Sequence, residues 1–192
     1  MGAGREPHVS GGHPPRPPIP IRPFDPDAAA PGAGELAAWL AGCLGPEPRV
    51  VERVVAADRP SADDEPMPVG EVAAAVDAGR QAAAKAAGEG VTVLVGTGGA
   101  TEPAARVTSA LSTLEAGPLG ILRRQGDAET ALLCGLALGA GEHGLAYVAD
   151  GDAAFAGAAV AIALEPDLRP RVRASDEIGS DLDSALEALR AA

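Results

Sequence analysis

The chain has 192 residues, a formal net charge of -12 and a sequence pI of about 4.6. This length fits one domain with a sizeable core, and the acidic balance argues against nucleic acid or an anionic membrane surface as partner, because both reward clustered Lys and Arg. Alanine and glycine dominate, while the sequence holds one Trp, one Tyr and two Phe, so the core is expected to rely on closely packed backbones.

Residues 1–33 hold half of the proline, including the run HPPRPPIPIRPFDPD, and lack helical or strand periodicity. This composition predicts a disordered or polyproline-like arm, followed by a single α/β domain over residues 34–192. The PxxP spacing could dock on an aromatic groove of a partner, but a solvated tail is the favoured interpretation. His8 and His13 lie in the arm and are therefore not candidates for catalysis.

After the arm, helical and strand patterns alternate. A helix is predicted over residues 34–44, where Leu36, Trp39, Leu40 and Cys43 share one face, and RVVERVVAAD then predicts a strand. The proline-rich, acidic stretch RPSADDEPMP predicts a linker or a surface loop.

The alternation continues to the C-terminus. Thr101 is the expected N-cap of a helix that tolerates Pro103 in its first turn, and Ser180 and Asp183 open a last helix at capping-box spacing. The other predicted elements are a helix over 70–87 closed by Gly88, a strand over 91–95, a helix over 102–114, a strand over 120–124, a helix over 127–139, a strand over 145–150, a helix over 152–164 and a strand over 171–175. This order predicts a three-layer α/β fold of the Rossmann-like kind, with a mainly parallel sheet and helices on both faces.

One strand is expected to lead into a glycine turn, within VTVLVGTGGATEPAARVTSAL. Ligands of parallel sheets bind beyond the carboxyl ends of the strands, where the N–H groups of Gly96, Gly98 and Gly99 could face an anion beside a helix N-terminus. The motif lacks the third glycine of a dinucleotide fingerprint, where Thr101 stands, and the Gly-Lys-Ser/Thr ending of a P-loop. The pattern therefore leaves two interpretations, an anion site or a tight corner between a strand and a helix.

Carboxylates mark the same edge of the predicted sheet. Asp150, Gly151 and Asp152 follow a strand and precede a small-residue helix, so a carboxylate there could orient a ribose hydroxyl. Alternatively, Asp152 caps the helix and Asp150 bonds to local backbone. Glu129, in the first turn of its helix, could face a ligand or only favour the helix dipole.

Other reactive side chains carry weaker signals. Cys43 and Cys134 show no CxxC spacing, which favours free thiols in a reducing compartment over a disulfide or a metal site. Arg123 and Arg124 could meet a phosphate or form an ordinary pair at a strand edge. His143 is expected in a surface loop, because no Ser or Cys nucleophile stands in an elbow motif.

The N-terminus has no basic stretch followed by an apolar region, and no charge-free apolar run reaches the length of a membrane span. We therefore expect a cytoplasmic protein that binds neither membrane nor nucleic acid. No pattern in the sequence calls for a metal or a cofactor.

Three long segments follow one another in the order MPVGEVAAAVDAGRQAAAKAAGEGVTVLVGTGG, EPAARVTSAL and ETALLCGLALGAGEHGLAYVADGDAAFAGAAVAIALEPDLRP, after the shorter GELAAWLAGCLG and VVAADRP. Together, over residues 34–190, they resemble the nicotinate-nucleotide-dimethylbenzimidazole phosphoribosyltransferase family, which builds the lower-ligand nucleotide of cobalamin. The resemblance implies an α/β fold, a homodimer and a reaction without metal.

In that reaction a benzimidazole nitrogen attacks the ribose C1 of nicotinate mononucleotide, nicotinate leaves, and α-ribazole phosphate forms. The partners implied are thus a small-molecule nucleotide and an aromatic base. The residues expected to bind them are Gly96, Thr97, Gly98, Gly99, Glu129, Asp150 and Gly151.

The sequence also departs from the family. Thr97 stands where the family's glycine turn has a Glu, and ATE replaces its Asn-Thr-Thr run. Only LEAG stands where the family has the loop with its phosphate-facing lysine, and Asp176 replaces a histidine. The family continues to a Gly-Glu-Gly-Ser-Gly segment with the catalytic base, for which we expect no counterpart here.

The catalytic residues are therefore unassigned. A non-catalytic binding or regulatory subunit, associated with itself or with a related chain, is the alternative function. A dinucleotide-dependent oxidoreductase ranks last, because the fingerprint is incomplete and no ribose-binding acid ends the next strand.

Overall fold

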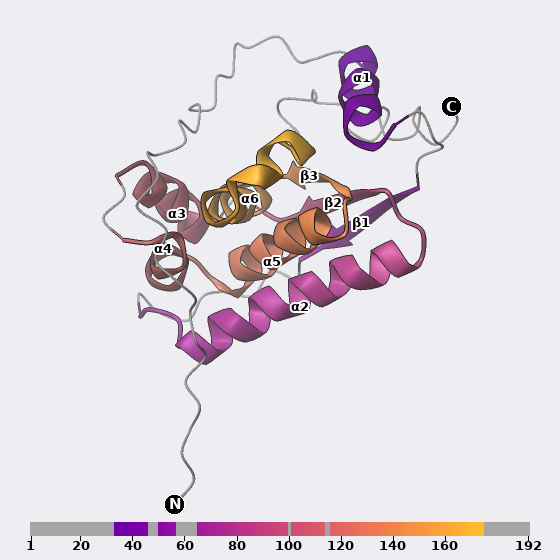
Figure 1. Ribbon diagram of the computed structural model, residues 1–192. Helices are drawn as coiled ribbons and strands as arrows, with labels where there is room; N and C mark the ends of the chain where they lie inside the picture. Colours follow the sequence, from indigo (N-terminus) through magenta and orange to yellow (C-terminus); the bar gives the residue numbers. More distant parts are fainter. Residues whose placement is uncertain (1–32, 46–49, 57–64, 100, 114–115, 175–192) are drawn as a thin grey trace, which may run out of the picture.

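The computed structural model of the protein describes residues 33–45, 50–56, 65–99, 101–113 and 116–174. Nearly all of the predicted arm, much of RPSADDEPMP, and the predicted last helix with Ser180 and Asp183 lie outside these residues, as does Asp176. The elements, in chain order, are α1 (Ala33–Leu44), β1 (Val51–Val55), α2 (Val69–Gly88), β2 (Val93–Thr97), α3 (Glu102–Thr113), α4 (Pro118–Gln125), α5 (Ala128–Glu142), β3 (Ala146–Asp150), α6 (Asp152–Leu164), the 3-10 helix η1 (Pro166–Arg171) and β4 (Val172–Ala174) (Figure 1).

The four strands form one parallel sheet in the order β1-β2-β3-β4. The central strands β2 and β3 are apolar runs buried on both faces, which is typical of parallel sheets. The predicted α/β class and parallel sheet are thus confirmed. The order runs in one direction across the described strands, without the reversal that marks the ligand crevice of doubly wound folds.

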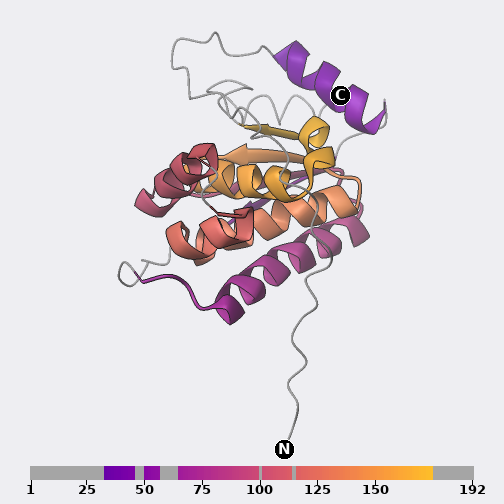
Figure 2. The same cartoon turned by 60° about the vertical axis from the view of Figure 1, so that its left-hand side comes forward.

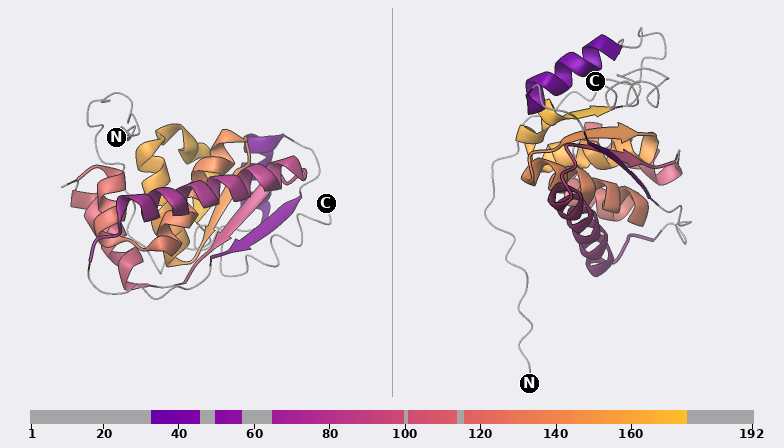
Figure 3. Two further views of the ribbon diagram at one scale, coloured as in Figure 1. Left: turned by 90° about the horizontal axis from the view of Figure 1, so that it is seen from below. Right: turned by 90° about the vertical axis from the view of Figure 1, so that its right-hand side faces the viewer.

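Helices cover both faces of the sheet, but unequally. Crossovers between parallel strands are right-handed, so a one-directional strand order places all the connecting helices on one face. On that face α5 packs between α2 and α6, whereas α1 lies on the other face, as the edge-on views show (Figures 2 and 3). The three-layer arrangement is confirmed, with α1 as the only helix on the second face within the described part of the chain.

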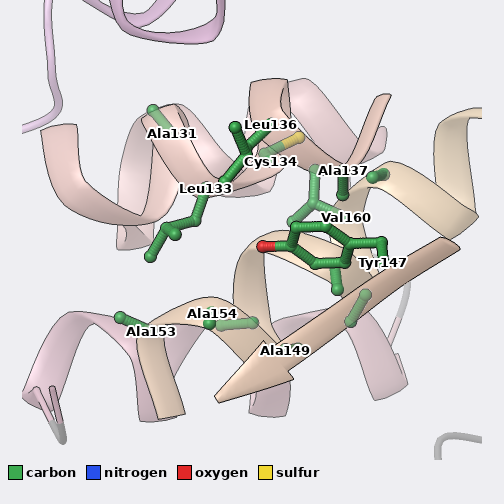
Figure 4. Close-up of a cluster of buried hydrophobic side chains, with 14 of the residues drawn as sticks. Ala131, Leu133, Cys134, Leu136, Ala137, Tyr147, Ala149, Ala153, Ala154 and Val160 are labelled. Carbon is green, nitrogen blue, oxygen red and sulfur yellow. The ribbon is translucent and has the colours of Figure 1, made fainter. Parts of the chain in front are cut away.

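The core divides between the two faces because side chains alternate along a strand. Leu94 and Tyr147 point into the larger cluster with α5 and α6, where the Tyr147 ring lies beside Val160 (Figure 4). Val95 and Val148 point the other way and pack against Leu40 of α1.

Small residues let the helix backbones approach closely. A Cβ added at Gly79 would overlap the carbonyl of Leu132, and one at Gly135 would overlap the carbonyl of Val76. Glycine is therefore required on both sides of the contact between α2 and α5. The expectation that the core relies on closely packed backbones is confirmed.

Two helix starts follow the sequence signals. The Thr101 hydroxyl accepts the N–H of Ala104 at 3.2 Å, as expected of the N-cap of α3. The Asp127 carboxylate caps α5 by accepting the N–H of Thr130 at 2.8 Å. Each contact satisfies a donor that the helix itself leaves unpaired.

The strand predicted over residues 120–124 is wrong, because this segment belongs to helix α4. Ile121 and Leu122 are buried next to each other, a pattern too short to separate a strand from a helix by periodicity. Pro118 at the first helical position, after Gly117, is the local feature that favours the helix. β2 also begins at Val93 rather than at residue 91.

Candidate functional site

The glycine turn lies at the carboxyl edge of the sheet, between the ends of β2 and β3. Thr97 at the end of β2 pairs with Asp150 at the end of β3. The first turn of α5, with Glu129, reaches this edge, since Glu129 contacts the backbone of Gly99. The structure therefore brings all seven expected binding residues to one region, although not onto one surface.

The N–H groups of the glycine turn are engaged within the protein. The Gly98 N–H donates to the carbonyl of Asp150 at 3.0 Å, which extends the ladder between β2 and β3. The Gly99 N–H donates to Oε1 of Glu129, also at 3.0 Å. The Gly99 carbonyl accepts the N–H of Ala153 in α6 at 3.1 Å. The turn is thus tied to β3, α5 and α6 at once.

Packing explains two of the three glycines. A Cβ at Gly96 would overlap the Tyr147 hydroxyl, and one at Gly98 would lie 2.6 Å from Leu133 Cδ1 and 2.7 Å from Glu129 Oε1. Gly99 is exposed, and a Cβ there would meet nothing within 4 Å. Of the three glycines, only Gly99 has open space that a ligand could approach.

Gly151 is required by both conformation and space. Its φ of 89° lies in the left-handed region, and a Cβ would overlap the carbonyl of Gly98. Asp152 is not the N-cap of α6, because Gly151 occupies that position and Asp152 is the first helical residue. The backbone conformation and close packing of Gly151 therefore explain the Asp-Gly corner, and the interpretation of Asp152 as the helix cap is wrong.

Asp150 and Thr97 face the opposite side of the sheet from the Glu129 contact. Strand alternation puts Thr97 on the same face as Val95, and Asp150 on the same face as Val148, which is the face that α1 covers. The Thr97 hydroxyl donates to Asp150 Oδ2 at 3.1 Å. The expected binding residues thus divide into a hydroxyl–carboxylate pair on one face and a turn held by Glu129 on the other.

Arg53 of β1 joins this pair and was not among the residues expected from the sequence. Its Nη2 lies 4.0 Å from Asp150 Oδ2, with side chains 34% and 28% exposed. A partly exposed pair at this distance contributes little to stability, about 1 kcal/mol at most. The only signal in the sequence is the charged pair Glu52 and Arg53 within the strand VERVV, and the strand register is needed to place Arg53 beside Asp150.

Polar side chains in the core gather at the start of α5. Among the described residues, the buried polar and charged side chains are Asp127, Glu129 and Thr130. Asp127 and Glu129 have the hydrogen bonds given above, whereas Thr130 Oγ1 has no partner. Sequence reasoning named Glu129, but nothing in the local pattern distinguishes a buried acid from an exposed one.

The buried groups near the sheet are poor acid–base candidates. Burial raises the pKa of the Cys134 thiol to about 12. Burial, and then the neighbouring Cys134, raise the pKa of Tyr147. Both groups therefore keep their protons at neutral pH and provide neither a thiolate nor a base.

The structure gives the positions of the other reactive side chains that the sequence singled out. His143 is exposed at the C-terminal end of α5, whereas the glycine turn contacts the other end of that helix. Arg123 and Arg124 occupy the last turn of α4 rather than a strand edge. Cys43 and Cys134 are both free thiols.

The described residues contain no group of three or more His, Cys, Asp or Glu placed to hold a metal ion. Within the same residues, no helix combines the length and the apolar character that crossing a bilayer needs.

The sequence was compared with known proteins. No curated protein matches the chain. A family model described as phosphoribosyltransferase matches residues 104–191, a segment that includes Glu129 and Asp150 but begins after the glycine turn.

Solved structures match over a longer part of the chain. A nicotinate-nucleotide-dimethylbenzimidazole phosphoribosyltransferase from Thermus thermophilus is 24% identical, with a TM-score of 0.53, and the match covers 78% of this chain and 60% of that one. CobT from the same organism is 23% identical, with a TM-score of 0.51, and the match covers 78% of this chain and 61% of that one. The match thus spans about three fifths of these relatives, and at such identities the likeness shows the fold.

The family match and the fold comparison agree with the order of motifs in the sequence. Residues 104–191 match the phosphoribosyltransferase family model, the described fold is that of the nicotinate-nucleotide-dimethylbenzimidazole phosphoribosyltransferases, and the resemblance of this chain to that family is confirmed.

Proposed function

We propose that the protein transfers the phosphoribosyl group of nicotinate mononucleotide to a benzimidazole-type base. The observation that carries the proposal is that Glu129 and Asp150, both within the segment that the family model matches, contact the glycine turn at one edge of the sheet, from its two faces. In the reaction the C1–N bond to nicotinate breaks and a C1–N bond to the base forms, while the base loses its N–H proton. Such a transfer needs a cradle for phosphate, contacts to ribose and a group that takes the proton.

The described residues suggest roles for two of these three parts. Gly99 offers open space beside the end of β2, which suits the approach of a phosphate or ribose. We assign to Asp150, whose carboxylate accepts the Thr97 hydroxyl, a hydrogen bond from a ribose hydroxyl. Gly96, Gly98 and Gly151 support this arrangement by allowing close packing. The group that takes the proton is unassigned.

A direct assay tests the activity. The purified protein is mixed with nicotinate mononucleotide and dimethylbenzimidazole, and chromatography follows the formation of α-ribazole phosphate. We expect product with the wild-type protein and a loss of about tenfold or more in kcat/KM with Asp150→Asn. Glu165→Gln is the control, because Glu165 is an exposed acid at the far end of α6. Absence of product with the wild-type protein would refute the proposed activity.

A non-catalytic binding or regulatory subunit is the second candidate. It is supported by the internal engagement of the Gly98 and Gly99 N–H groups and by Thr97 at the position of the family's Glu. In this case calorimetry would detect nucleotide binding while the assay detects no product. Binding of neither nucleotide nor base by a stable monomer would argue against it.

We also propose that the protein is cytoplasmic and, as the family resemblance implies, a homodimer. Light scattering of the purified chain is expected to give twice the mass of 19.0 kDa. A monomer at micromolar concentration would contradict the dimer.

A further inference from the structure

The strongest unexplained feature of the glycine turn is the carboxylate that already occupies it. Glu129 is only 4% exposed, yet its Oε1 accepts the N–H of the exposed Gly99 at 3.0 Å. A carboxylate that accepts a backbone N–H makes a charge-assisted bond, stronger than a neutral one. The side chain therefore holds the position that an external anion would take at this donor.

Gly98 is shaped around the same carboxylate. An added Cβ at Gly98 would lie 2.7 Å from Glu129 Oε1 and 2.6 Å from Leu133 Cδ1, so the missing side chain leaves room for both neighbours. The Gly98 N–H is already committed to the Asp150 carbonyl, a backbone bond that belongs to the sheet. The Gly99 N–H, in contrast, has a side chain as its partner. A side chain can rotate away from its hydrogen bond far more readily than two paired strands can separate.

We propose that Glu129 is a resident anion on the Gly99 N–H and that a phosphate group must displace it to bind at the glycine turn. The nature of the ligand, a nucleotide phosphate, rests on the proposed function. One N–H cannot serve both anions, and two negative charges at this distance repel each other. Glu129 thus sets the affinity of the turn for phosphate and keeps the turn closed when no ligand is present.

Three variants and one control test this role. Glu129→Ala removes the competing acceptor, Glu129→Gln removes the charge but keeps an acceptor, and Glu165→Gln removes an exposed charge from the far end of α6. Circular dichroism shows which variants are folded. Calorimetry then measures the binding of inorganic phosphate and of nicotinate mononucleotide, and NMR measures hydrogen exchange at the Gly99 amide.

A hydrogen bond to a charged group corresponds to about a tenfold to hundredfold change in affinity. We therefore expect Glu129→Ala to bind both probes about tenfold to a hundredfold more tightly than the wild-type protein, with Glu129→Gln in between and Glu165→Gln unchanged. Exchange at the Gly99 amide should be faster in Glu129→Ala. Unchanged or weaker binding in a folded variant, or an unchanged exchange rate, would overturn the inference.

The outcomes separate this inference from the proposed function. Product formation by the wild-type protein, without tighter binding by Glu129→Ala, refutes the inference and leaves the function standing. Binding by Glu129→Ala alone supports the inference and refutes the activity of the unmodified chain. If no form binds phosphate or the nucleotide, both are wrong.

Discussion

Replacing Tyr147 by Phe is expected to stabilise the protein, although it removes a polar group from the only tyrosine in the sequence. Tyr147 is 1% exposed, and its hydroxyl has no hydrogen-bond partner. Leaving a buried polar group unpaired costs about 1–3 kcal/mol. The variant keeps the ring, which lies beside Val160 in the larger apolar cluster (Figure 4).

The small gap left by the oxygen subtracts part of this gain, about 1 kcal/mol at most. The expected net effect is a gain of about 0–2 kcal/mol in the free energy of unfolding. Urea denaturation measures it, and the midpoint should rise without a change in slope. A loss of more than about 1 kcal/mol would show that the hydroxyl has a partner and would refute the reasoning.

A double-mutant cycle tests whether the Tyr147 hydroxyl lies against Gly96. Gly96→Ala places a Cβ onto the Tyr147 oxygen and is expected to cost about 1–3 kcal/mol in the wild-type background. In the Tyr147→Phe background the cost should fall by about 1 kcal/mol, and not to zero, because Cζ of the ring would still lie 2.8 Å from the new Cβ. Additive effects of the two substitutions would mean that the hydroxyl does not lie against Gly96.

Three further outcomes follow from the structure. The pKa of the Cys134 thiol is raised from 9.0 to about 12 in the folded protein, so the unfolded chain loses this proton at lower pH. The free energy of unfolding should therefore fall as the pH rises above about 9. Urea denaturation measures this decline, which should be flatter in Cys134→Ala. Trp39→Phe should lower the free energy of unfolding by about 0.5–1.5 kcal/mol in guanidinium denaturation, since the indole N–H donates to the Pro170 carbonyl at 2.8 Å; an unchanged midpoint would contradict that contact. Gly151→Ala should lower the melting temperature through a loss of more than about 1 kcal/mol, whereas Gly99→Ala, which meets open space, should change it little; equal effects would contradict the geometry.

The sequence predicts helices well where local signals agree. Asp152–Leu164 was predicted with both bounds, because a small-residue run follows an Asp-Gly corner and ends before Pro166. The helix Val69–Gly88 lies within one residue of the predicted bounds 70–87, because its alanine-rich run stands between Pro68 and a glycine. The strand predicted over residues 120–124 was wrong because two adjacent apolar residues fit both the strand period and the helix period. The packing around Ile121 and Leu122, which are buried, decides in favour of the helix.

The site was less predictable, since it depends on distances across the sheet. Arg53 and Asp150 are separated along the chain by the helices α2 to α5, and only the register β1-β2-β3 places them on one face. Thr97 and Gly98 are neighbours in sequence, but strand alternation sends their contacts to opposite faces. A list of residues near one strand end therefore does not define one surface.

Glycines at a strand-to-helix turn have two physical explanations, and the pattern Gly-Thr-Gly-Gly fits both. A ligand requires glycine where it approaches the backbone from outside, whereas packing requires glycine where a neighbour approaches from inside. Gly98 belongs to the second case, because a Cβ there would lie 2.6 Å from Leu133 Cδ1 and 2.7 Å from the Glu129 carboxylate. The latter neighbour is itself an anion, bound to the next N–H in the turn. An anion site and a tight corner are therefore not exclusive alternatives here: the corner is built around an acid of the protein's own, and phosphate binding at Gly99 depends on how readily that acid leaves.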